Sequence, residues 1–296
     1  MRDSAVRELK LYPNPDTARV NALLKVLNAP TYLAEREQVM PYLREATALS
    51  RRLNYPRGIV SCHMSTGAYY KSASRYPEAL MQYDSALMAI PQGDTSFNRL
   101  KAISFERKGA IYLEQGNLYA ALDHFFESLQ YQESHSFNRT VRLNLFITDI
   151  YLELGNFEKA EEFCKQNLKI LENNYSVSLA NSIYFNVIDI AIAKRDIPTA
   201  LKYLDKVAPF IPSPNQVQES FGYYLKRGDV SALQEKYVEA QRFYELAYKY
   251  AKQGDHRKSI SAILQRLSST ALKLDDVESA KKFTLENLEL SEEIGR

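Results

Sequence analysis

Apolar and small residues recur along the chain at helical spacing. In the stretch 67–91, Gly67 and Tyr70 are followed by Ala79, Tyr83 and Ala86. Residues three or four apart share one side of a helix. The pattern therefore predicts two helices in this stretch, each with a small-residue and aromatic face that packs on the other.

The same spacing returns in the stretch GAIYLEQGNLYAALDHFFESL, which begins at Gly109, and in later copies with different residues. One position of the second predicted helix marks each copy, at steps of 40, 42, 39, 40, 40 and 40 residues: Val39, Ala79, Ala121, Ala160, Ala200, Ala240 and Ala280. A fixed period of this size is typical of stacked helical repeats. We predict an extension over residues 1–16 and an array over 17–296, with repeats at about 17–56, 57–98, 99–138, 139–178, 179–218, 219–258 and 259–296.

Two glycines fall inside predicted first helices. A glycine costs a helix interior about 1 kcal/mol relative to alanine, so Gly67 and Gly109 predict a close backbone approach to the partner helix. Tyr83, Phe125 and Tyr244 are expected to fill the space between the two helices. Turn-forming residues or a proline, as in EQGNLYAAL, separate the two helices of each copy.

This pattern of a small residue, an aromatic three positions on, and a second helix with Ala, aromatic and Ala, closed by Pro91, resembles the tetratricopeptide repeat. The resemblance implies an all-α fold, a right-handed α-solenoid (alpha-alpha superhelix) of about seven TPR-like helix pairs. The chain departs from the minimal 34-residue repeat in its longer period. It also has His63 where a large residue is expected early in the first helix, and Pro30 where an aromatic is expected.

The stretch NPDTARVNALLKVLN at 14–28 resembles a narrower group, bacterial membrane-anchored signalling or transcription regulators in which a tetratricopeptide array precedes a membrane helix and an output domain. The residues that carry this resemblance are Pro15, Asp16, Thr17, Arg19, Val20, Asn21 and Leu24. It implies that the array is a periplasmic sensor and that the sequence is a fragment; without it, we expect a cytoplasmic protein. Apolar positions of the last helix, including Phe283 and Leu288, fit a further segment, while its many charges fit a self-capped end.

Composition favours a folded interaction protein over an enzyme. The 296 residues are 45% hydrophobic and 25% charged with a net charge of +2, which gives no global field for nucleic acid or an anionic membrane. No apolar run is long enough for a membrane helix. Phosphate-binding, nucleophile-elbow and HExxH motifs are absent, and the four histidines are scattered. We therefore predict no catalytic residues, no cofactor, no metal, no nucleic-acid binding and no membrane insertion by this segment.

Stacked helix pairs leave a concave face lined by first helices, which suits a peptide or a partner helix. Residues of those helices that point away from the pair's own core are the predicted groove: Arg107, Arg142, Asp149, Phe185, Asn186, Asp189 and Lys226, with Arg266, Leu145 and Phe146 beside them. Asn186 and Asp189 are the favoured pair, because they lie three apart on an otherwise apolar helix. The tetratricopeptide clamp for acidic C-terminal tails is broken here, with Leu24 and Ile103 at two of its positions.

Three functions fit these observations. The first is the protein- or peptide-binding sensor region of a bacterial signalling regulator, and the second is a free-standing cytoplasmic scaffold or adaptor. The third is a peptide-pheromone receptor of a regulator, since arrays of that type also have units near forty residues. A homodimer is compatible with each. A membrane helix, kinase or DNA-binding segment encoded after Arg296 would favour the first.

Overall fold

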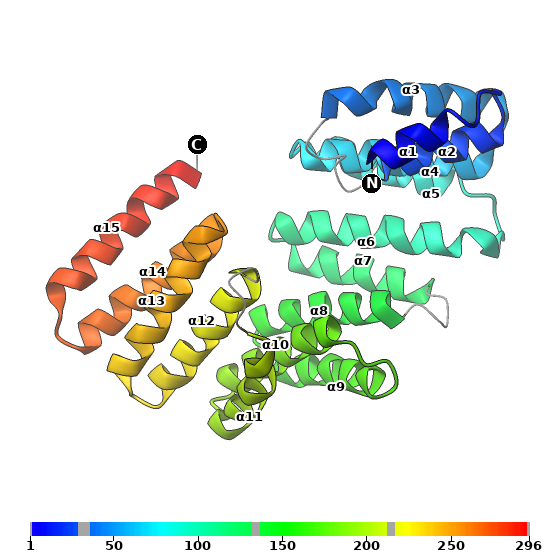
Figure 1. The fold of residues 1–296 in the computed structure, drawn as a ribbon. Coiled ribbons are helices and arrows are strands. Elements are labelled where there is room, and N and C mark those ends of the chain that lie inside the picture. The colour runs from blue at the N-terminus through cyan, green and yellow to red at the C-terminus, as the bar shows by residue number, and fades with distance from the viewer. Residues whose placement is uncertain (1, 29–35, 132–136, 212–216, 295–296) are drawn as a thin grey trace. The chain divides into compact units, whose positions relative to one another are not determined.

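The computed structural model describes residues 2–28, 36–131, 137–211 and 217–294. Over these ranges the secondary structure consists of α-helices and two short 3-10 helices, with no strand (Figure 1). The helices are α1 (Arg2–Leu9), α2 (Thr17–Leu27), α3 (Arg36–Arg52), α4 (Pro56–Ser72), α5 (Tyr76–Met88), η2 (Thr95–Phe97), α6 (Asn98–Glu114), α7 (Leu118–Gln130), α8 (Phe137–Glu153), α9 (Phe157–Asn173), α10 (Val177–Ala193), α11 (Ile197–Val207), η3 (Ala208–Phe210), α12 (Val217–Leu233), α13 (Tyr237–Gln253), α14 (Arg257–Lys273) and α15 (Val277–Ile294).

Consecutive helices pack as pairs: α2 with α3, α4 with α5, α6 with α7, α10 with α11, α12 with α13, and α14 with α15. Between α8 and α9, the Asn144 amide donates to the Asn167 side-chain oxygen over 3.0 Å, and the Tyr151 and Phe163 rings stack. The predicted all-α solenoid of helix pairs is confirmed. The exact repeat boundaries stay a prediction.

The chain divides into two compact units, residues 1–143 and 144–296. We call them the N-terminal unit and the C-terminal unit and describe each by itself. No described helix is both long and apolar enough to cross a bilayer.

The turn inside most pairs has one recurring geometry. One residue adopts a positive φ, at Ser74, Gly116, Gly155, Arg195, Glu235 and Asp275. In four of these turns the residue that follows caps the second helix: the side chains of Asn117, Asn156, Asp196 and Asp276 accept the N–H three residues on. Pro77 and Pro198 stand in the first turn of α5 and α11, where a missing N–H costs nothing. The predicted turns are therefore at the expected places.

The marker alanines of the second helices are buried as predicted. Ala79, Ala121, Ala160, Ala200 and Ala240 have no exposed surface, and Ala280 has 3%. The predicted role of the first-helix glycines needs a correction. A Cβ on Gly67 would lie 2.9 Å from the Tyr83 ring, so this glycine makes room for an aromatic ring of the partner helix more than for its backbone. At Gly109 both effects occur, because the Phe125 ring and the Ala121 carbonyl are close.

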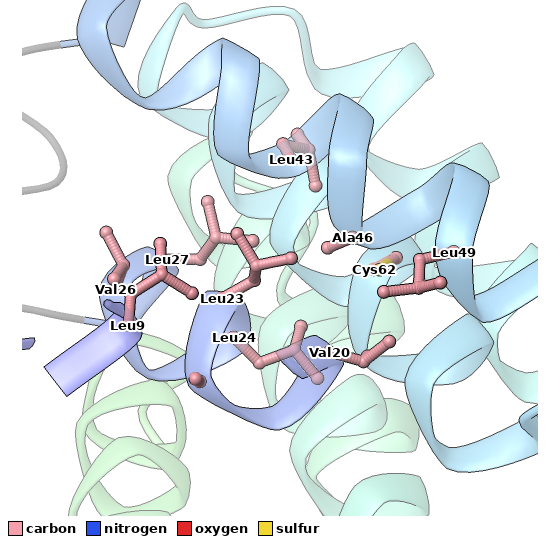
Figure 2. Close-up of a cluster of buried hydrophobic side chains, with 11 residues drawn as sticks. Leu9, Val20, Leu23, Leu24, Val26, Leu27, Leu43, Ala46, Leu49 and Cys62 are labelled. Carbon is pink, nitrogen blue, oxygen red and sulfur yellow. The ribbon is translucent and has the colours of Figure 1, made fainter. Parts of the chain in front are cut away.

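The predicted N-terminal extension includes α1, which contributes to the core of the N-terminal unit. Leu9 of α1 packs into a cluster with side chains of α2, α3 and α4, including Leu23, Ala46 and Cys62 (Figure 2). All are nearly inaccessible to solvent. Pro30, the irregular position noted in the first repeat, lies outside the described residues.

Candidate functional site: polar side chains on the first helices

In the C-terminal unit, polar side chains of successive first helices pair with each other. The Asn186 amide of α10 donates to Asp149 of α8 over 2.8 Å, and the Lys226 ammonium of α12 binds Asp189 of α10. Arg266 Nε of α14 binds Asp229 of α12 over 2.6 Å. Each pair spans 37 residues of sequence. We call Asp149, Asn186, Asp189, Lys226, Asp229 and Arg266 the polar ladder.

The ladder follows directly from the repeat. Its three acids stand 40 residues apart, and so do the three residues that bind them. The two middle first helices, α10 and α12, therefore each present an acid to the next first helix and an amide or a cation to the previous one. The repeat therefore places a similar polar pair at each contact between successive first helices of the C-terminal unit.

Three acids of the ladder face only two cations. Lys226 and Arg266 neutralise Asp189 and Asp229, whereas the partner of Asp149 is the neutral amide of Asn186. Asp149 is exposed to solvent while Asn186 is buried. Asp149 is thus a solvent-facing carboxylate without a direct cationic partner in the ladder.

The surroundings of Asp149 favour its protonated form. Although solvent reaches the side chain, protein atoms crowd it, and this partial desolvation together with the Asp189 charge raises the pKa of Asp149 to about 6. The Asn186 hydrogen bond and the Lys226 charge act in the opposite direction without cancelling the rise.

The last junction of the ladder also includes a second helix. The Tyr244 hydroxyl of α13 donates to Asp229 Oδ1 over 2.9 Å, so one carboxylate joins α12, α13 and α14. Burial and the Asp229 charge raise the pKa of Tyr244. For Arg266, burial opposes the charged form, but Asp229 outweighs it and raises the pKa.

The Phe185 ring also lies beside the ladder. The Lys226 ammonium sits 5.6 Å from the centre of the half-buried Phe185 ring, within the range of a cation–π interaction. The ladder therefore offers charged, amide and aromatic surface together.

The N-terminal unit has a different arrangement, in which arginines surround one buried acid. Glu106 of α6 is 6% exposed, and Arg142 of α8 donates to both of its oxygens, over 2.8 and 3.0 Å. Nε of Arg139 lies 3.6 Å from Oε2 of the same carboxylate. Arg99 and Arg107 also act electrostatically on Arg139. We call Arg99, Arg107, Arg139 and Arg142 the arginine cluster.

The predicted groove residues thus separate into two sets. The structure brings Asp149, Phe185, Asn186, Asp189, Lys226 and Arg266 together on the first helices of the C-terminal unit, and it places Arg107 and Arg142 in the arginine cluster. Leu145 and Phe146 are half-buried on α8. That these residues bind a partner stays a prediction.

Sequence reasoning missed Asp229, Glu106, Arg99 and Arg139. The signal for Asp229 was available, because it stands 40 residues after Asp189, as Asp189 does after Asp149. Glu106 had no such signal: its role depends on burial against α8, which the sequence pattern does not state.

Within the described ranges, no three His, Cys, Asp or Glu side chains are placed to hold a metal ion. Cys164 lines a pocket of about 270 Å³ between α9, α10 and α11, and burial raises the pKa of its thiol to about 12. Such a thiol is a poor nucleophile near neutral pH, because the thiolate is the reactive form.

Comparison with known families gives one match, to the model described as MalT-like TPR region, over residues 18–220. A search of curated proteins finds no match.

Comparison with solved structures finds many of the same fold. A Rap protein complexed with competence and sporulation factor is 12% identical, with a TM-score of 0.69 over 94% of this chain and 78% of that one. The apo form of RapI is 14% identical, with a TM-score of 0.62 over 93% and 77%. A signal-transduction ATPase with a tetratricopeptide repeat sensor from Pyrococcus horikoshii is 17% identical, with a TM-score of 0.56 over 92% of this chain and 40% of that one. At these identities the likeness concerns the fold.

Proposed function

Because the chain belongs to the MalT-like TPR region family, we propose that it is the protein- or peptide-binding region of a signalling regulator and that the polar ladder holds its ligand. Folds of this type generally act as interaction scaffolds that use their repeats as an extended surface. The similar folds include a Rap protein solved with a bound factor and a sensor region of a signalling ATPase. Both are consistent with a sensory role.

The observation that carries the proposal is the unneutralised carboxylate of Asp149 beside Asn186. An extended peptide leaves its backbone N–H and C=O groups unpaired, and side-chain amides and carboxylates can bind them. Asp149 accepts hydrogen bonds and attracts a cation, such as a peptide's amino terminus or a Lys or Arg side chain. The Phe185 ring adds apolar contact area close by.

Two of the three acids in the ladder are already paired with cations, which limits where a ligand can bind. Asp189 and Asp229 are already bound to cations, so a ligand gains most at the junction between α8 and α10. We therefore place the anchor of the ligand at Asp149 and Asn186. The Lys226–Asp189 and Arg266–Asp229 pairs hold the first helices in register.

The experiment begins with a library of random 12-residue peptides displayed on phage and panned against the full chain. Affinities of the selected peptides are then measured by calorimetry for wild type, Asp149→Ala and Asn186→Leu. We expect each substitution to weaken binding by at least about tenfold, because it removes one of the two side chains proposed to anchor the ligand. Selected peptides are expected to be enriched in basic residues.

Glu239→Ala is the matched control, since Glu239 is an exposed acid on the second helix α13 of the same unit. It is expected to leave affinity unchanged, and circular dichroism verifies the fold of every variant. Failure to select any binder, or binding that all three substitutions weaken equally, would contradict the proposal.

A further inference from the structure

The arginine cluster concentrates positive charge around a single acid. Arg139 and Arg142 of α8 form ion pairs with Glu106 of α6, and the charges of Arg142, Arg99 and Arg107 act on Arg139. Arg99 and Arg107 are exposed and form no ion pair with any residue that the structure describes. The two helices therefore present an excess of positive charge at the surface of the N-terminal unit.

The cluster already binds one carboxylate. Arg142 Nη2 donates to both oxygens of Glu106, with Arg139 close to one of them. Guanidinium groups bind carboxylates through planar, charge-assisted hydrogen bonds. Glu106 is thus an internal example of the chemical group that the remaining arginines can accept.

The like charges lie close enough to affect one another. Burial lowers the pKa of Arg139, Glu106 counteracts this, and Arg142, Arg99 and Arg107 act in the same direction as burial. Arginine keeps its proton in proteins, so the cluster cannot relieve this repulsion by titration. Bound anions would relieve it.

We propose that the arginine cluster binds an acidic segment of a protein partner through two or more of its carboxylates. Arg99 and Arg107 are eight residues apart on α6, which places them about 12 Å apart along the helix axis. An extended peptide covers this span with about four residues. A short run with acids at both ends therefore matches the cluster.

This inference goes beyond the peptide site proposed on the ladder. It concerns the other unit and a ligand of opposite charge, so either proposal can fail alone. Arg107 stands at one position of the tetratricopeptide clamp, but the pattern of the clamp is broken at Leu24 and Ile103, and the other three arginines of the cluster lie outside it.

The test measures binding of fluorescein-labelled hexaglutamate to the full chain by fluorescence anisotropy at low ionic strength. Wild type is compared with Arg99→Ala/Arg107→Ala, which removes the two exposed arginines and leaves the Glu106 contacts in place. Arg51→Ala/Arg52→Ala is the control, because it removes two exposed arginines of the same unit outside the cluster. We expect about a tenfold loss of affinity for the first variant and less than about a twofold loss for the control.

Labelled hexaglutamine is expected not to bind, and raising the salt concentration is expected to weaken hexaglutamate binding. Three results would overturn the proposal. They are an absence of hexaglutamate binding, an equal loss in both double variants, and tighter binding of a single-stranded DNA of similar length that depends on Arg99 and Arg107. The last would identify the surface as a nucleic-acid site.

Discussion

At the scale of single residues, the close packing of a pair depends on a glycine facing an aromatic ring. In α12, a Cβ on Gly228 would lie 2.4 Å from the Tyr244 ring, a distance that side chains do not tolerate. The ring cannot easily move away, because its hydroxyl is bound to Asp229. Gly222, on the same helix, has open space where its Cβ would be.

Gly228→Ala is therefore expected to lower the free energy of unfolding by about 1–3 kcal/mol, as overpacking does in other cores. Gly222→Ala is expected to raise it by about 1 kcal/mol through helix propensity. Urea denaturation followed by circular dichroism measures both. Equal effects of the two substitutions would show that the ring contact is not limiting.

The raised pKa of Asp149 predicts a pH dependence of stability. Its pKa is about 6 in the folded protein and about 4 in the unfolded chain, so the folded state binds the proton more tightly. Stability contributed by this group is then greatest at acid pH and falls as the pH rises from about 4 to about 6.

Asp149→Asn removes this titration while keeping an oxygen that can accept from Asn186. The variant and the wild type are expected to differ little in free energy of unfolding at pH 4. At pH 7 the variant is expected to be more stable by about 1 kcal/mol, a value reduced for the exposure of the side chain. Denaturation curves at a series of pH values give this difference, and a difference that does not change with pH would contradict the assignment.

At the scale of helices, one carboxylate can join several helices through its hydrogen bonds. Asp229 binds Arg266 of α14 and Tyr244 of α13, and its own side chain is 17% exposed. Removing it leaves a guanidinium and a hydroxyl without their shared partner. An unpaired group costs more than the pair contributed, because its desolvation is no longer compensated.

We expect Asp229→Ala to lower the free energy of unfolding by about 2 kcal/mol. The comparison is Glu293→Ala, which breaks an exposed ion pair with Arg257 at 3.5 Å between α14 and α15. Exposed pairs contribute little, so this loss is expected to stay below about 0.5 kcal/mol. Thermal and urea unfolding measure the loss in free energy of unfolding for each variant. Equal losses in the two variants would contradict this prediction.

At the scale of the whole molecule, each compact unit contains one buried free thiol. Cys62 belongs to the N-terminal unit and Cys164 to the C-terminal unit. Burial raises the pKa of both thiols. Their reaction with a thiol reagent therefore reports local opening around each cysteine.

Contacts in a repeat array are made between neighbours, so the effect of a substitution is expected to decrease with the number of repeats that separate it from the probe. Gly228→Ala is predicted to speed labelling of Cys164 by dithiobis-nitrobenzoate several-fold more than labelling of Cys62. Cys62→Ser and Cys164→Ser backgrounds separate the two rates. If both thiols became reactive together, the array would instead open as a single cooperative body.

Much of the fold could be predicted because the relevant signals are local. The marker alanines, the glycine–aromatic pairs and the turn residues each act within one helix or one pair, and the 40-residue period repeats them. The candidate site could be predicted only in part. Helical spacing pointed to Asp149, Asn186, Asp189 and Lys226 as surface residues, but not to which of them bind each other.

The sequence by itself determined an all-α array of helix pairs, because short-range periodicity dictates which face of each helix is apolar. Only the tertiary structure decided that acids of one first helix meet residues 37 positions later. It also decided that Glu106 is buried beside arginines while Asp149 pairs with an amide. The reason is physical: the charge state and partners of a side chain depend on the packing offset between stacked helices, which no single helix encodes.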